Sequence, residues 1–63
     1  MPDYSSNGII KKLLEVGFTL DRVKGSHHIY KNREGKRVVV PHPKKDLPKG
    51  TFNSILRQAG LQR

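Results

Sequence analysis

Three histidines are the side chains of this chain best suited to chemistry near neutral pH. His27 and His28 follow the pair Gly25–Ser26, with Lys24 just before that pair, and His42 stands between two prolines. An imidazole with an ordinary pKa of about 6.5 can take up or release a proton near neutrality. A general base that removes the proton of an RNA 2′-hydroxyl lets that oxygen attack the adjacent phosphate. Nearby cations stabilise the negative charge that develops. Histidines at the start of a strand are more often structural or merely exposed, so position alone selects none of the three.

Other kinds of catalytic site find little support. The chain has no cysteine, Ser26 has no evident orienting carboxylate, and the five acidic residues are scattered. Zinc sites normally need three or four ligands, whereas His27 and His28 are adjacent and would point to opposite faces of a strand. A chain of 63 residues also leaves no room for a deep cofactor cavity. We therefore expect neither a metal site nor a cofactor.

The charge is strongly basic and concentrated in the middle of the chain. The 13 Lys and Arg outnumber the 5 Asp and Glu, for a net charge of +8, and nine basic residues but only two acidic ones lie between Arg22 and Lys49. Such a concentration predicts a polyanionic partner, most commonly nucleic acid, although a solvated face would also account for it. Lys44 and Lys45 join this basic segment, so we favour phosphate binding over simple solvation for them.

Two segments have the apolar spacing of amphipathic helices. Ser5–Asn7 supplies good N-cap residues, and a stripe at helical spacing follows: Ile9, Ile10, Leu13, Leu14 and Val16. Gly17 is suited to end that helix. The second helix carries a stripe of Phe52, Ile55, Leu56 and Ala59. Pro48 is expected in its first turn, with Leu47 as a poor cap, and Gly60 is expected just after its end.

Between the helices the pattern changes to that of strands. Phe18–Val23 alternates, Lys24–Ser26 reads as a tight turn, and His27–Asn32 is the second strand. Asn32–Lys36 is expected to form a hairpin loop with Gly35 at positive φ. Arg37 to Val40 then forms a third strand, whose ladder Pro41 should stop because proline has no N–H. Tyr30 is expected in the core rather than stacked on a base.

The predicted fold is therefore α+β, with the order α-β-β-β-α. Short connections favour a three-stranded antiparallel sheet, and two helices with one apolar stripe each can cover one face of it. This two-layer sandwich is the architecture of double-stranded-RNA-binding domains, although a fold does not fix a function. We expect one domain over residues 1–63. The longest apolar runs are far too short to span a bilayer, and Met1–Gly8 lacks the layout of a signal peptide, so we expect a cytoplasmic protein.

Several motifs in a fixed order resemble the HicA family of bacterial toxin–antitoxin systems. They cover almost the whole chain, from Ile9 to Leu61: Gly17-Phe18, Val23 to Tyr30, Val40 to Pro43, Asp46 to Thr51, and Ile55 to Leu61. Any one of these pieces would be weak, but their order within 63 residues is specific.

The resemblance implies a ribosome-independent, mRNA-cleaving toxin with a double-stranded-RNA-binding-like fold, neutralised by a HicB-type antitoxin. It assigns catalysis to the histidine of the Gly-Ser-His motif, here His27, and importance to Gly25, while His28 falls at a more variable family position. With the residues themselves, this predicts His27 as catalytic and Lys24, Gly25, Ser26, Lys44 and Lys45 as RNA-binding.

Two other readings stay open. One is a non-catalytic double-stranded nucleic-acid-binding module, although such modules usually begin their second helix with several basic residues and here only Lys49 is charged. The other is a pure interaction protein that docks an acidic partner.

Overall fold

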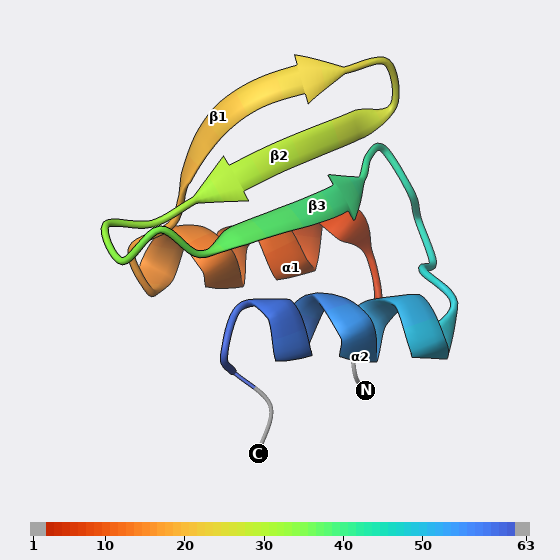
Figure 1. The fold of residues 1–63 in the computed structure, drawn as a ribbon. Helices are drawn as coiled ribbons and strands as arrows, with labels where there is room; N and C mark the ends of the chain where they lie inside the picture. Colours follow the sequence, from red (N-terminus) through yellow and green to blue (C-terminus); the bar gives the residue numbers. More distant parts are fainter. Residues whose placement is uncertain (1–2, 62–63) are drawn as a thin grey trace.

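A computed structural model describes residues 3–61, and the fold consists of a sheet lying over two helices (Figure 1). The elements in chain order are α1 (Ser6–Glu15), β1 (Thr19–Lys24), β2 (His27–Lys31), β3 (Arg37–Pro41) and α2 (Lys49–Gln58). The strands form one antiparallel sheet in the order β1-β2-β3. The predicted α-β-β-β-α sandwich, with the topology of double-stranded-RNA-binding domains, is confirmed. No helix within residues 3–61 has the length and apolar character needed to span a bilayer.

Both helices end in the same way. The N–H of Phe18 donates to the carbonyl of Leu13 at 2.9 Å, and that of Leu61 donates to the carbonyl of Leu56 at 2.8 Å. Each bond skips back over a glycine, Gly17 in one case and Gly60 in the other, which is the Schellman arrangement. The predicted helix ends are therefore confirmed. Because Phe18 is brought onto the core by this turn, the end of α1 also fixes the start of the sheet.

The helix starts follow the prediction less closely. Ser5 caps α1, since its Oγ accepts from the N–H of Gly8 at 3.0 Å. Pro48 is the cap residue of α2 rather than a member of its first turn, and no side chain caps that helix. Leu47, considered above as a poor cap, is buried in the core instead. The burial of Leu47 draws the chain inward before α2 begins, which displaces the start by one residue.

A β-bulge between Leu20 and Arg22 interrupts the alternation predicted for the first strand. Leu20 pairs with Tyr30 and Arg22 pairs with Ile29, so Asp21 is the extra residue. A bulge places two neighbouring side chains on one side of a strand and increases its twist. The predicted alternation is therefore wrong from Arg22 onward, because Arg22 lies on the same face as Asp21.

Pro41 does not stop the third strand. It pairs with His27, and the next residue continues the ladder, because the N–H of His42 donates to the carbonyl of Ser26 at 2.8 Å. In an antiparallel pair only alternate residues exchange hydrogen bonds. Pro41 occupies a position where the missing N–H would not have faced β2, so the proline costs the ladder nothing.

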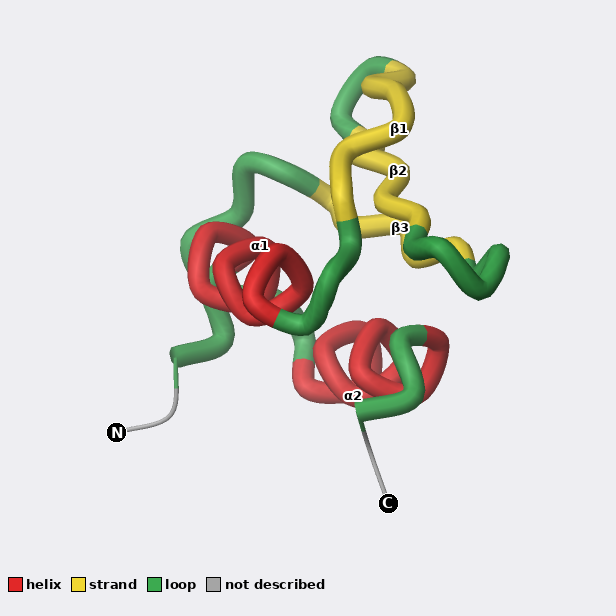
Figure 2. Tube along the Cα trace, turned by 90° about the vertical axis from the view of Figure 1, so that its left-hand side faces the viewer, coloured by secondary structure: helices red, strands yellow, loops and turns green. Residues whose placement is uncertain are grey.

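The core lies between β3, the middle strand and the two helices, as Figure 2 shows from the side. Its buried members are apolar apart from one hydroxyl of Tyr30: Ile9, Leu13, Phe18, Tyr30, Val38, Val40, Leu47, Ile55 and Ala59. Burial raises the pKa of Tyr30, and its predicted place in the core is confirmed. Leu14 and Val16 are about half exposed, so the stripe predicted for α1 is narrower than expected. β1 lies farthest from the helices (Figure 2).

Candidate active site

The connection between β1 and β2 is a two-residue turn formed by Gly25 and Ser26. Gly25 has a φ of +58°, and no non-glycine residue in the described chain has positive φ, which is the type II′ pattern of tight hairpins. A Cβ at Gly25 would meet nothing within 4 Å, so the glycine is needed for its backbone conformation and leaves open space beside it. This turn is narrower than the sequence indicated, because Lys24 still belongs to β1.

His27 is the first residue of β2 and lies directly beside this turn. It is paired with Lys24 on β1 and with Pro41 on β3, and its side chain is exposed. Directly opposed residues in a sheet share a face and have Cβ atoms about 4.5–5.5 Å apart. The imidazole and the Lys24 ammonium group therefore share the face of the sheet that is turned away from α1 and α2, called the open face below.

His28 lies on the other face, as the alternation of strand residues predicted. It is paired with the buried Val40 and is itself half-buried. Its ring meets that of His42 edge to face, with ring centroids 4.6 Å apart. The two adjacent histidines of the motif are thus separated by the sheet, and only His27 is presented on the open face.

Ser6 makes hydrogen-bonding contacts with His42 and Lys44 that the sequence did not reveal. It is the buried polar side chain of the core layer, and its Oγ lies 2.6 Å from Nδ1 of His42. The same oxygen accepts from the N–H of Lys44 at 2.8 Å and lies 3.1 Å from the Lys44 carbonyl, which also accepts from the Ser6 N–H. Because the His42 N–H donates to the carbonyl of Ser26, the contacts of Ser6 join α1 to the segment that borders the Gly25–Ser26 turn. The only signal in the sequence was that Ser6 is, like Ser5 and Asn7, a candidate N-cap residue.

The loop with Lys44 and Lys45 leaves the same end of the sheet as the Gly25–Ser26 turn and descends toward α2 (Figure 1). The backbone of Lys44 is fixed by Ser6, and both lysine side chains are exposed. The structure thus gathers the predicted site residues at one end of the molecule. His27, Lys24, Gly25 and Ser26 form one contiguous group there, and the lysine loop borders it through His42.

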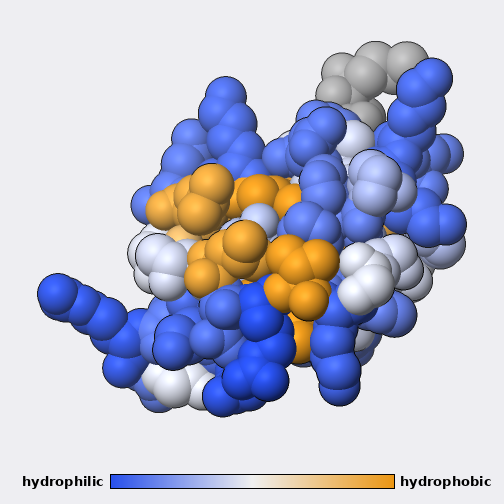
Figure 3. All heavy atoms as spheres, turned by 90° about the horizontal axis from the view of Figure 1, so that it is seen from above, coloured by the Kyte–Doolittle hydropathy of each residue, from blue (hydrophilic) through white to orange (hydrophobic). Residues whose placement is uncertain are grey.

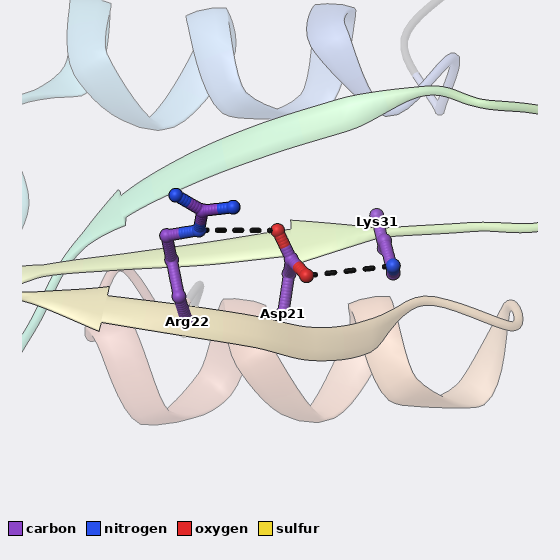
Figure 4. Close-up of polar contacts among 3 residues, drawn as sticks. All are labelled: Asp21, Arg22 and Lys31. Atoms are coloured by element: carbon purple, nitrogen blue, oxygen red, sulfur yellow. Dashed lines mark ion pairs between the residues drawn. The ribbon is translucent and has the colours of Figure 1, made fainter.

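One acidic side chain lies on the open face among cations. Figure 4 shows Asp21 between Arg22 and Lys31, with the helices behind the strands. Its carboxylate is 3.5 Å from Nε of Arg22 and 3.4 Å from Nζ of Lys31. Burial would raise the pKa of Asp21, but the charges of Lys31, Arg22 and Arg37 outweigh it, and the pKa is lowered. The ionised carboxylate therefore holds two cations in place on this face. Within residues 3–61, no three His, Asp or Glu side chains gather where they could hold a metal ion.

Comparison with known proteins gives one family. The model of the HicA toxin of bacterial toxin–antitoxin systems matches residues 6–61, from the first residue of α1 to the chain just beyond α2. No curated protein matches the chain.

Proposed function

The chain belongs to the HicA toxin family of bacterial toxin–antitoxin systems, and on that premise we propose that it is a ribosome-independent, metal-independent mRNA endoribonuclease with His27 as its catalytic residue. Family membership implies mRNA interferase activity and an antitoxin partner. His27 supports the finer proposal because it is exposed on the open face, beside a glycine turn and opposite Lys24. We place residues 1–63 in one such toxin domain.

The chemistry needs a base, an anion-binding group and the RNA itself. His27 takes the proton of a ribose 2′-hydroxyl, the freed oxygen forms a bond to the adjacent phosphorus, and the bond from phosphorus to the 5′-oxygen of the next nucleotide breaks. The leaving oxygen receives a proton, which the protonated His27 can return. Lys24 and the N–H groups of the Gly25–Ser26 turn stabilise the negative charge that grows on the phosphate oxygens. The products are a 2′,3′-cyclic phosphate and a 5′-hydroxyl.

Removing the nucleophile tests this mechanism directly. A defined transcript should be cut by the purified protein without ribosomes and in excess EDTA. A matched transcript with a single 2′-deoxynucleotide at the cleaved position should stay intact there, because no hydroxyl is left to attack. Gel electrophoresis of end-labelled RNA measures both. Cleavage of the deoxy-substituted bond, or cleavage that returns only when a divalent ion is added, would contradict the mechanism.

Gly25 is proposed to let a phosphate approach the turn closely, beyond its role in the turn itself. Asparagine tolerates positive φ, so Gly25→Asn should keep the hairpin while its side chain fills the open space beside the backbone. We expect the melting temperature to change little and cleavage to fall by roughly 10- to 100-fold, the cost of misplacing a substrate by about 1 Å.

Gly35→Asn is the matched control, because Gly35 also has positive φ and open space but lies in the β2–β3 loop, at the other end of the strands. It should leave the rate of cleavage at saturating RNA unchanged. Equal activity of the two variants would show that Gly25 serves the turn alone.

The partner is proposed to be a HicB-type antitoxin that covers the Gly25–His27 turn or the basic surface beside it. Exposure of His27 supports this, since inhibition by occlusion requires that the imidazole be reachable from outside. A complex that is inactive with His27 still open to solvent would contradict occlusion.

Binding of double-stranded nucleic acid without cleavage is the second candidate, and the topology of the fold favours it. The start of α2 does not, because the charged residue of its first turn is Lys49 and Pro48 caps it. Retention of intact RNA by the protein under every buffer condition would select this alternative.

A further inference from the structure

The open face carries cations around an apolar centre. Three rows of opposed residues cross the strands on this face, with His27 in the first row. The second row joins Arg22, Ile29 and Val39, and the third brings Lys31 opposite Arg37. Six of these residues form what we call the open-face array: Arg22, Lys24, Ile29, Lys31, Arg37 and Val39.

The cationic side chains of the array are exposed to solvent. Arg22 and Lys31 are more than half exposed although both contact the Asp21 carboxylate. Arg37 lies on the opposite edge strand and is exposed, and it acts on the same carboxylate through its charge. Four cations against one carboxylate leave this face strongly positive. One carboxylate, paired with two of the cations, therefore orders them without neutralising the face.

The centre of the array is apolar and uncovered. Ile29 and Val39 are directly opposed, and Val39 is 40% exposed although its neighbours Val38 and Val40 are fully buried. Both helices lie on the other side of the sheet (Figures 1 and 2). Seen from above, the apolar side chains at the surface gather in the middle with polar ones around them (Figure 3). The exposed apolar residues also include Leu20 and Val23 of β1, which are paired with Tyr30 and His28 and so lie on the helix side of the sheet.

We propose that the substrate is bound as single-stranded RNA lying across the open face, with phosphates on the four cations of the array and nucleosides against Ile29 and Val39. This rests on the proposed cleavage at His27 and assigns the path of the RNA away from it. A duplex turns its bases inward and offers phosphates, 2′-hydroxyls and groove edges, so it would leave the apolar centre without a partner. A single strand can place sugar and base surfaces there while its phosphates reach cations on either side.

The path has an exit at the end of the sheet away from His27. Lys31 lies four positions after His27 along β2, which is roughly 13 Å of extended strand. There a surface groove of about 580 Å³ is lined by Gly17, Thr19, Lys31, Asn32 and Arg33. The groove adds the Arg33 guanidinium to the line of positive charge. RNA therefore has a continuous basic route from the turn to the β2–β3 loop.

Three single substitutions on the array test the path: Arg22→Ala, Lys31→Ala and Arg37→Ala. Each should raise KM for a short unstructured RNA about three- to tenfold with kcat unchanged, and reduce the slope of log affinity against log salt by nearly one contact. Lys11→Ala removes the same charge from the exposed side of α1 and should change neither quantity. Binding by the unsubstituted protein is measured with a strand carrying the 2′-deoxynucleotide, which remains uncut.

Competition separates the two forms of RNA. Unlabelled single-stranded RNA should displace the uncut strand well below the concentration at which a duplex of equal length does. Array variants that behave like Lys11→Ala, or a duplex that competes equally, would overturn the path while leaving cleavage at His27 intact. Failure of the unsubstituted protein to cut any RNA would instead overturn the proposed function.

Discussion

His27→Ala is expected to abolish RNA cleavage and the growth arrest that follows it. The substitution removes the group proposed to carry the 2′-hydroxyl proton, and a positioned acid or base contributes about 10²- to 10⁴-fold to a rate. Because His27 is exposed at the start of β2, its side chain contributes little to packing and the variant should fold. Single-turnover cleavage of a defined transcript gives the rate, and circular dichroism confirms the fold.

His28→Ala is the control for this experiment. It removes the neighbouring imidazole, but from the helix-covered face, where the ring meets His42. Cleavage should continue near the normal rate even if the melting temperature falls. Undiminished cleavage by the His27 variant would exclude the proposed base, and loss of cleavage in the His28 variant alone would move the chemistry to the other face of the sheet.

Phe18→Ala is expected to remove a large part of the stability of the protein and to lower its melting temperature steeply. Phe18 is 2% exposed and is the largest fully buried side chain, set in place by its hydrogen bond to Leu13. Truncating a buried phenylalanine costs about 3–5 kcal/mol. At about 0.05–0.15 kcal/mol per residue, a domain of this length has a total stability of about 3–9 kcal/mol. The loss is therefore about a third or more of the free energy of unfolding.

Far-UV circular dichroism and thermal melting measure this loss. Leu14→Ala is the matched control, because Leu14 lies on the same helix but is 53% exposed, and surface changes of this kind stay within about 0.5 kcal/mol. A Phe18→Ala variant that melts cooperatively at the same temperature as Leu14→Ala would contradict the placement of Phe18 at the centre of the core.

The order of elements and the helix ends could be predicted because each depends on local chemistry. Gly17 and Gly60 mark helix ends by backbone freedom, and the spacing of Ile9, Leu13 and Ile55 marks buried faces. The opposite placement of His27 and His28 also follows from strand geometry alone. The family, identified from motifs spread along the whole chain, is confirmed by the match over residues 6–61.

The features that escaped prediction depend on contacts between distant parts of the chain. The bulge at Asp21 is set by how β1 pairs with β2, and nothing in the local alternation marks it. Ser6 meets His42 and Lys44 across more than thirty residues, so its burial was invisible beside an equally good cap candidate. Pro41 was misjudged because the harm done by a missing N–H depends on which edge of the strand it faces.

The open-face array also sets what an inhibitor of this protein must look like. A protein that covers four outward cations has to bring carboxylates where RNA would bring phosphates, and it has to lay aliphatic groups against Ile29 and Val39. Such an antitoxin would mimic RNA, because its carboxylates would have to be spaced like the phosphates of a short transcript. Higher ionic strength would then weaken the binding of the antitoxin and of the RNA together, since both rely on attraction to the same cations, which salt screens.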